Sequence, residues 1–382
     1  MATRVHRAPA VPLASAAAGE RAAKVAALAA LLGAKALAGW GVQWDIRWHL
    51  VIGRDSFWIA PHLMTYAGVT IAALVSFWVL AADTWRARRR PTAPGAVTVL
   101  GLTGSPGWHL AWWGIAATLL AAPIDDLWHR LFGLDVTLWS PPHLLGILGA
   151  QVNTLGSLRI ALELWPAGTW RRRASVLCAG ILLLGGFAIA LDEGVQTAFR
   201  HGGLLFFTWP LLAALVLGFA LVLVGRWAEL RWAPPLLALG CFGFHLLGLA
   251  VGDAGFRWTR PVPAVEEAIA AQPDSPVAIA HEMARRNGTP VGRTLLLRWL
   301  PIAPAVLMAL ADVRRRPATA GLAFALGLTL LAGVMLARLP ALAHARPSPA
   351  ETAVALALAA AGGLGGARLA ARAAERLAPT TA

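Results

Sequence analysis

Residues 44–63 place one carboxylate and two imidazoles at a spacing that suits a metal ion. Asp45 and His49 are four residues apart, and His62 follows directly after a proline. Side chains four residues apart share one face of a helix, and a His at the start of the next helix can fold back onto that face. Because a carboxylate with two imidazoles is a ligand set that binds transition metals, this stretch predicts a metal site.

Residues 125–145 repeat this pattern with one residue inserted. The corresponding side chains are Asp125, His129 and His143, and both copies have a Trp directly before the first His. A single Asp/His pair at a membrane boundary more often anchors a loop through hydrogen bonds. The recurrence of the whole triplet favours metal binding, so we predict two related sites. A hydrogen-bonded lock between helices is the alternative.

Further polar residues are placed where they could support these sites. Four of them are candidates for orienting a ligand imidazole through its second nitrogen: Arg54, Asp55, Asp126 and Asp135. Glu193 and His201, on a later loop at the same predicted end of the molecule, are additional candidates. Pro61 and Pro142 suit the first turn of a helix, where no backbone N–H is needed, and would fix the position of the His that follows.

The elements that must position these residues are membrane-spanning helices. The chain is 58% hydrophobic and only 14% charged, whereas a soluble domain is about 25% charged. Its mean hydropathy is +0.63, and apolar runs of about 20 residues, long enough to cross a bilayer, recur along it. We therefore predict an all-α polytopic transmembrane bundle of about ten spans. The runs lie near 23–43, 62–82, 107–127, 142–164, 174–191, 203–225, 233–252, 294–312, 319–338 and 350–370.

The predicted organisation has three parts. Residues 1–22 form a cytoplasmic tail, residues 23–165 form a membrane domain with both repeats, and residues 166–382 add further spans. The last part contains a long outer loop at 253–293. A loop of this length is uncommon unless it caps or binds something, and residues 263–272 within it predict a short helix over the outer face.

The net charge of +14 arises mainly from short Arg clusters between the apolar runs. This placement is typical of a membrane protein that follows the positive-inside rule, and it argues against a nucleic-acid partner. All clusters fall on one side if every run spans, so we expect both termini in the cytoplasm and both Asp/His stretches facing the periplasm or exterior. The composition, rich in Ala, Gly and Arg, favours a bacterial inner (plasma) membrane.

Two features inside the apolar runs need a partner. Lys35 lies in the first run, where it is either functional or satisfied by snorkelling or by an acid within the bundle. Arg159 and Glu163 are four residues apart in the fourth run, which predicts a structural ion pair.

Residues 40–150 resemble part of the C subunit of the membrane-bound copper monooxygenases, the particulate methane and ammonia enzymes. The first group of similar residues is Asp45, Trp48, His49, Arg54, Asp55, Phe57 and His62, with the proline displaced by one place to Pro61. The second is Asp125, His129, Pro141 and His143, with Asp125 where that family has Asn. The resemblance implies a copper ion at each triplet, on the outer side of the membrane. The chain departs from that family by its long second half.

Three functions are compatible with these features. The first is a copper-dependent oxidase or monooxygenase-like protein that acts on a small apolar substrate, working with other membrane subunits or a periplasmic copper protein. The alternative is non-catalytic copper acquisition, storage or delivery, although five Met provide no methionine ladder through the spans. A structural or sensory protein is the third. Zinc or iron would suit the same ligands but are less favoured than copper.

Overall fold

The computed structural model describes residues 13–53, 56–92, 94–132, 138–203, 205–293 and 296–378. Helices account for nearly all regular structure in these residues, which confirms the predicted all-α bundle. In chain order the long and short helices are α1 (Leu13–Val51), α2 (Ala60–Ala87), α3 (Pro106–Phe132), α4 (Pro141–Leu164), α5 (Trp170–Ala190), α6 (Glu193–His201), α7 (Leu205–Ala228), α8 (Ala233–Thr259), α9 (Val265–Ala271), α10 (Pro276–Asn287), α11 (Leu296–Trp299), α12 (Ile302–Leu310), α13 (Pro317–Leu336), the 3-10 helix η1 (Pro340–Ala345) and α14 (Pro349–Arg376).

Nine helical segments of the described residues are long and apolar enough to cross a membrane. The predicted run at 294–312 differs, because it forms the two short helices α11 and α12, which are separated near Pro301. This broken segment still connects two distant parts of the molecule. Arg298 in α11 pairs with Asp192 after α5, and Arg231 before α8 donates hydrogen bonds to the carbonyl oxygens of Ala309 and Leu310.

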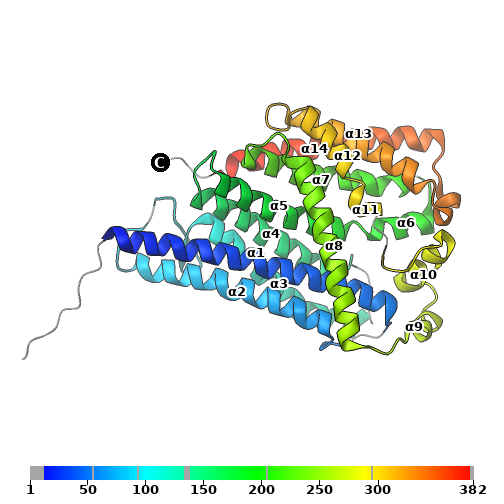
Figure 1. Ribbon diagram of the computed structural model, residues 1–382, viewed down its shortest axis with the longest axis horizontal. Coiled ribbons are helices and arrows are strands. Elements are labelled where there is room, and N and C mark those ends of the chain that lie inside the picture. The colour runs from blue at the N-terminus through cyan, green and yellow to red at the C-terminus, as the bar shows by residue number, and fades with distance from the viewer. Residues whose placement is uncertain are drawn as a thin grey trace, which may run out of the picture.

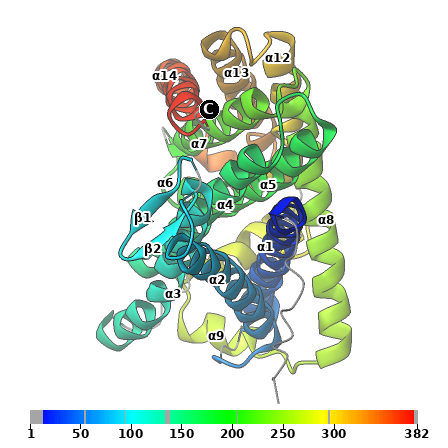
Figure 2. The same ribbon diagram turned by 90° about the vertical axis from the view of Figure 1, so that its left-hand side faces the viewer.

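The two repeats form two helix hairpins, α1 with α2 and α3 with α4. Glycines allow the backbones of each pair to approach closely. A Cβ added at Gly68 in α2 would lie 2.5 Å from the carbonyl oxygen of Ala34, and one added at Gly156 in α4 would lie 2.4 Å from the backbone nitrogen of Ala111. Figures 1 and 2 show α1 and α2 side by side along most of their length. The hairpins therefore hold the motif residues of consecutive helices at fixed positions.

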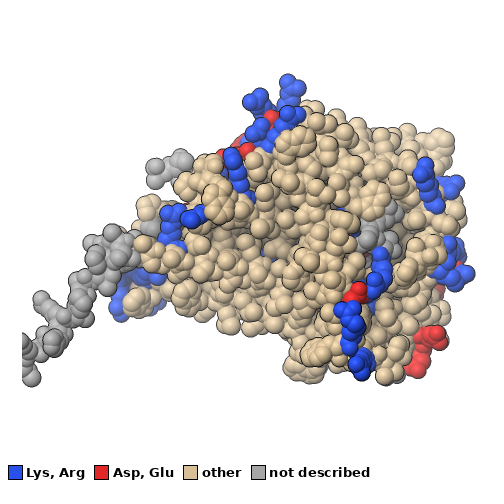
Figure 3. Space-filling view, in the orientation of Figure 1, with Lys and Arg blue, Asp and Glu red and all other residues tan. Residues whose placement is uncertain are grey.

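Ion pairs and hydrogen bonds gather the predicted Arg clusters at one end of the bundle. Arg21 binds the carbonyl oxygen of Leu164, and Arg172 lies 3.5 Å from Glu229. We call this the basic end, and the opposite end, which carries Asp45, the motif end. Figure 3 shows charged side chains gathered at both ends, with a broad uncharged face between them that suits lipid.

Two elements of the loops were not predicted. A two-stranded antiparallel hairpin of β1 (Val97–Val99) and β2 (Leu102–Gly104) lies between α2 and α3, and its Thr103 N–H donates to Thr84 of α2 at 2.8 Å. At the motif end, α9 confirms the helix predicted at 263–272, and α10 is a second helix in the same loop. Figure 1 shows α9 and α10 beside the ends of α1 and α8.

Candidate metal centre

The candidate centre lies where α1 ends and α2 begins. Asp45 and His49 occupy the last turns of α1, and His62 is in the first turn of α2. Between the helices, Gly53 adopts a positive φ of 73°, a conformation that glycine tolerates without strain. Pro61 lies within the first two positions of α2, as its sequence context predicted. The local sequence therefore turns the chain back so that His62 faces the helix that it follows.

The three side chains converge on one point. Their candidate ligand atoms all lie within 4.8 Å of one another. Nε2 of His62 is 3.1 Å from Oδ1 of Asp45, and Nε2 of His49 is 3.6 Å from the same oxygen. Ligand atoms about 2.1 Å from a tetrahedral metal are about 3.4 Å apart, so small adjustments would close a metal site here.

The hydrogen bonding of His62 indicates what this arrangement needs. Its Nδ1 lies 3.1 Å from the carbonyl oxygen of Ser56, which can only accept, so Nδ1 carries a proton. In a neutral imidazole Nε2 then presents a lone pair to Asp45. Oδ1 of Asp45 is buried and forms no hydrogen bond with the described residues. Two acceptors facing each other require a cation between them, either a metal ion or a second proton on the imidazole.

The segment that follows α8, residues 260–293, holds the end of α1 in place. The predicted loop at 253–293 begins later than expected, because α8 continues to Thr259. The last carbonyl groups of a helix have no partner within it. Here the Ala264 N–H donates to Ile52 at 2.7 Å, and Nε2 of His281 in α10 donates to Leu50 at 2.7 Å. The loop therefore caps the helix that carries two of the three candidate ligands.

Aromatic packing and an ion pair fix the other face of α1 against α8. The ring of Trp48 stacks on Phe256 with centroids 5.9 Å apart, and Trp44 packs edge-on against both rings. Arg47 donates to Asp253 at 2.8 Å and to the carbonyl oxygen of Leu249 at 3.1 Å. Sequence reasoning missed the Arg47–Asp253 pair, because nothing in the local pattern connects residues about 200 positions apart.

The second triplet is present in part among the described residues. Nε2 of His143, near the start of α4, lies 3.4 Å from Oδ1 of Asp125 in α3, close to the separation of His62 and Asp45. Pro142 is the second residue of α4 and thus lies in its first turn, as predicted. The side chain of His129 is outside the described residues, so the three-ligand site at this hairpin stays a prediction.

The other candidate residues have different surroundings. Arg54, Asp55 and Asp135 lie outside the described residues. Asp126 forms an exposed ion pair with Arg130 at 2.7 Å. Glu193 begins α6, its side chain is not among those described, and His201 ends α6, which packs against α7, α10 and η1.

The two polar features predicted inside the bundle both have partners. Lys35 is half-buried and donates to the carbonyl oxygen of Ala150 at 3.1 Å and to the Thr154 hydroxyl at 2.8 Å. It therefore joins α1 to α4 and does not pair with an acid. Arg159 and Glu163 form the predicted ion pair at 2.9 Å.

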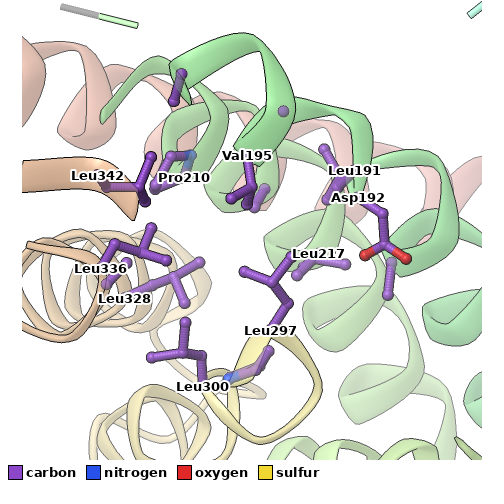
Figure 4. A pocket seen from close by; sticks show the side chains of 16 residues that line it. Leu191, Asp192, Val195, Pro210, Leu217, Leu297, Leu300, Leu328, Leu336 and Leu342 are labelled. Atoms are coloured by element: carbon purple, nitrogen blue, oxygen red, sulfur yellow. The ribbon is translucent and has the colours of Figure 1, made fainter. Parts of the chain in front are cut away.

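A separate apolar cavity of about 70 Å³ lies at the motif end of the second half of the bundle. Figure 4 shows Leu191, Val195 and Leu217 facing Leu328 and Leu336 across it. Its walls come from the α5–α7 region, α11, α13 and η1. By contrast, Asp45, His49 and His62, which together form the candidate metal triplet, lie on α1 and α2. The cavity offers van der Waals contact and no cluster of metal ligands.

Comparison of the chain with protein-family models, with curated proteins and with solved structures found no match. The resemblance of residues 40–150 to the copper monooxygenase C subunit stays a prediction carried by the two motifs.

Proposed function

We propose that the chain is an integral membrane protein that binds copper through Asp45, His49 and His62. The observation that carries the proposal is the convergence of both imidazoles on a buried carboxylate oxygen that has no hydrogen bond among the described residues. Two imidazoles and one carboxylate suit Cu, Zn or Fe(II), and Cu(II) binds such donors most tightly in the divalent series. The motif resemblance supports copper as well.

Three protein ligands leave room for a further one. The three side chains are each about one-fifth exposed, so water or a substrate can reach the centre. An open position is typical of sites at which a metal reacts or is exchanged. Bound copper would supply one-electron redox chemistry and Lewis acidity. In that setting Asp45 provides the negative charge, and the Ser56 carbonyl keeps Nε2 of His62 aimed at the metal.

Two activities are consistent with such a centre. The first is a copper-dependent oxidoreductase of the monooxygenase type that acts on a small apolar substrate, which the motif resemblance supports. The second is non-catalytic acquisition, storage or delivery of copper. It is supported by the exposure of the site and by the location of the apolar cavity, which lies between other helices and away from Asp45, His49 and His62. Reductant-dependent O2 consumption by the copper-loaded protein supports the first activity. Copper transfer to a chelator without O2 consumption supports the second.

The orientation that we propose follows from the distribution of Arg clusters. The basic end would face the cytoplasm of a bacterial inner membrane, with the metal centre toward the periplasm. Other membrane subunits or a periplasmic copper protein would then reach the centre from outside.

The test is the metal content of the purified, detergent-solubilised protein, measured by elemental analysis. We expect copper in the wild type and its loss in the His49→Ala/His62→Ala double variant. His344→Ala is the matched control, because His344 lies at the same end but binds the backbone carbonyl of Phe199. A His129→Ala/His143→Ala variant reports on the second triplet. If no transition metal co-purifies or binds on reconstitution, the triplet is a hydrogen-bonded lock between α1 and α2.

A further inference from the structure

A cleft of about 510 Å³ opens at the motif end on the face of α1 turned away from the metal triplet. Its walls come from the end of α1, the end of α8 and the loop that follows α10. Arg47 forms part of the cleft and lies between Asp45 and His49 in sequence, and positions two residues apart point to nearly opposite sides of a helix. Ligands of the cleft and of the metal triplet would therefore not compete.

The cleft carries an excess of positive charge. Four arginines line it, and one carboxylate, Asp253, opposes them. Asp253 is already occupied, because Nη2 of Arg47 lies 2.8 Å from its Oδ1 and Nη2 of Arg293 lies 2.5 Å from the same atom. The guanidinium groups of Arg257 and Arg260 are exposed and form no hydrogen bond or ion pair with the described protein. The cleft therefore contains two guanidinium groups, those of Arg257 and Arg260, whose charge no described carboxylate neutralises.

The side chain of Arg47 forms the immobile floor of the cleft. It is only 6% exposed and is held by the carbonyl oxygen of Leu249, by Asp253 and by the ring of Phe256, which lies 5.4 Å from the guanidinium carbon. Its Nε is buried and has no hydrogen-bond partner in the described part of the chain. A buried donor without a partner costs free energy that an oxygen of a ligand would recover.

The remaining surface of the cleft and its position indicate the kind of anion. Val51, Ile52 and Phe256 give the cleft apolar walls beside the arginines. Trp258 and Val262, on either side of Arg260, are 82% and 73% exposed, as expected for side chains at a membrane interface. Guanidinium groups bind phosphate oxygens in bidentate fashion.

We propose that this cleft binds a phosphate group. Arg257, Arg260 and Arg293 donate hydrogen bonds to it, and Arg47 provides an immobile positive charge at the floor of the cleft. The phosphate is carried either by the headgroup of an anionic phospholipid or by a free phosphate compound. The proposal does not depend on copper, because none of these residues belongs to the metal triplet.

The test is isothermal titration calorimetry of the full-length protein in detergent with two probes. The probes are short-chain phosphatidylglycerol and inorganic phosphate, and short-chain phosphatidylcholine provides a phosphate without net charge. Saturation by phosphatidylglycerol alone assigns the site to lipid, and saturation by inorganic phosphate as well assigns it to free phosphate compounds.

Variants show whether binding occurs in the cleft. Arg257→Gln/Arg260→Gln is expected to weaken binding at least tenfold, because it removes two charge-assisted contacts. Arg285→Gln/Arg286→Gln removes the same charge from exposed positions of α10 at the same end and is expected to change affinity less than twofold. Elution of all variants as wild type in gel filtration excludes misfolding. The proposal is overturned if neither anionic probe saturates, if phosphatidylcholine binds as tightly as phosphatidylglycerol, or if both double variants behave alike.

Discussion

At the level of single residues, the proton on Nδ1 of His62 decides what the candidate centre can bind. The carbonyl oxygen of Ser56 fixes that proton, and the lone pair of Nε2 then points at Oδ1 of Asp45. Without a metal, the two atoms are compatible only if the imidazole takes up a second proton. With a metal, the same geometry is ready for coordination, because a ligand His is normally oriented by a hydrogen bond from its other nitrogen.

The Asp45→Asn substitution tests this account. The new amide can still donate a hydrogen bond to Nε2 of His62, so the stability of the metal-free variant is expected to stay within about 1 kcal/mol of that of wild type. Its copper affinity is expected to fall at least tenfold, because the anionic ligand is lost. Thermal unfolding with and without copper measures both effects, since a ligand at 100 times its Kd stabilises a protein by about 2.7 kcal/mol. A copper-induced rise in Tm equal to that of wild type would contradict a ligand role for Asp45.

The residues show where sequence reasoning succeeds and where it stops. The spacing of Asp45 and His49 is local, so helical periodicity was sufficient to bring them together. The pairing of Arg47 with Asp253 depends on how α1 packs against α8, and no local pattern encodes that contact. The partner of Lys35 was missed for the same reason, because a backbone carbonyl and a Thr hydroxyl of α4 replace the acid considered for it.

At the level of elements, the crossing of α1 and α2 sets the positions of the candidate ligands Asp45, His49 and His62. A Cβ added at Gly41 would lie 2.5 Å from the Thr65 hydroxyl, 2.8 Å from the Thr65 backbone nitrogen and 3.1 Å from the carbonyl oxygen of Pro61. Pro61 and Thr65 flank His62 in sequence. A larger residue at Gly41 must therefore push the start of α2, together with His62, away from α1.

Gly41→Ala is expected to lower copper affinity without removing a ligand, and to cost about 1–3 kcal/mol of stability through overpacking. Gly33→Ala is the matched control on the same helix, because a Cβ there meets no atom within 4 Å. That control is expected to leave copper binding unchanged and to be neutral or up to about 1 kcal/mol stabilising. Copper titration of both variants, followed by thermal unfolding, provides the comparison. Equal copper affinity in the two would show that the helix crossing does not position the centre.

The elements also differ in how far hydrophobicity alone predicts them. Long apolar runs predicted the spanning helices, because a segment that crosses lipid must satisfy its backbone N–H and C=O groups by hydrogen bonds within the segment itself. The run at 294–312 is equally apolar, yet its prolines interrupt the helix and produce α11 and α12. The hairpin of β1 and β2 is too short to give a clear alternating pattern, and its position depends on Thr84 of α2.

At the level of the whole molecule, charge is distributed unequally between the two ends. The motif end pairs many of its arginines with carboxylates, such as Arg298 with Asp192 and Arg293 with Asp253. The basic end collects the Arg clusters at the connections from α2 to α3, α4 to α5, α7 to α8 and α12 to α13, where arginines outnumber acids. The positive-inside rule counts Lys and Arg in short loops, so the basic end is expected to face the cytoplasm.

Cysteine labelling tests this orientation. In a Cys178→Ala/Cys241→Ala background, Gln272→Cys introduces a thiol at an exposed position of the motif end, and Thr92→Cys introduces one at the basic end. A membrane-impermeant maleimide applied to intact bacterial cells is expected to label Gln272→Cys, and to label Thr92→Cys only after the membrane is permeabilised. Detergent-solubilised protein should react at both positions, which controls for thiol accessibility. The reverse pattern in intact cells would place the candidate metal centre on the cytoplasmic side. Copper would then have to reach the centre from the cytoplasm. Thiols there bind a soft metal in competition with two imidazoles and a carboxylate.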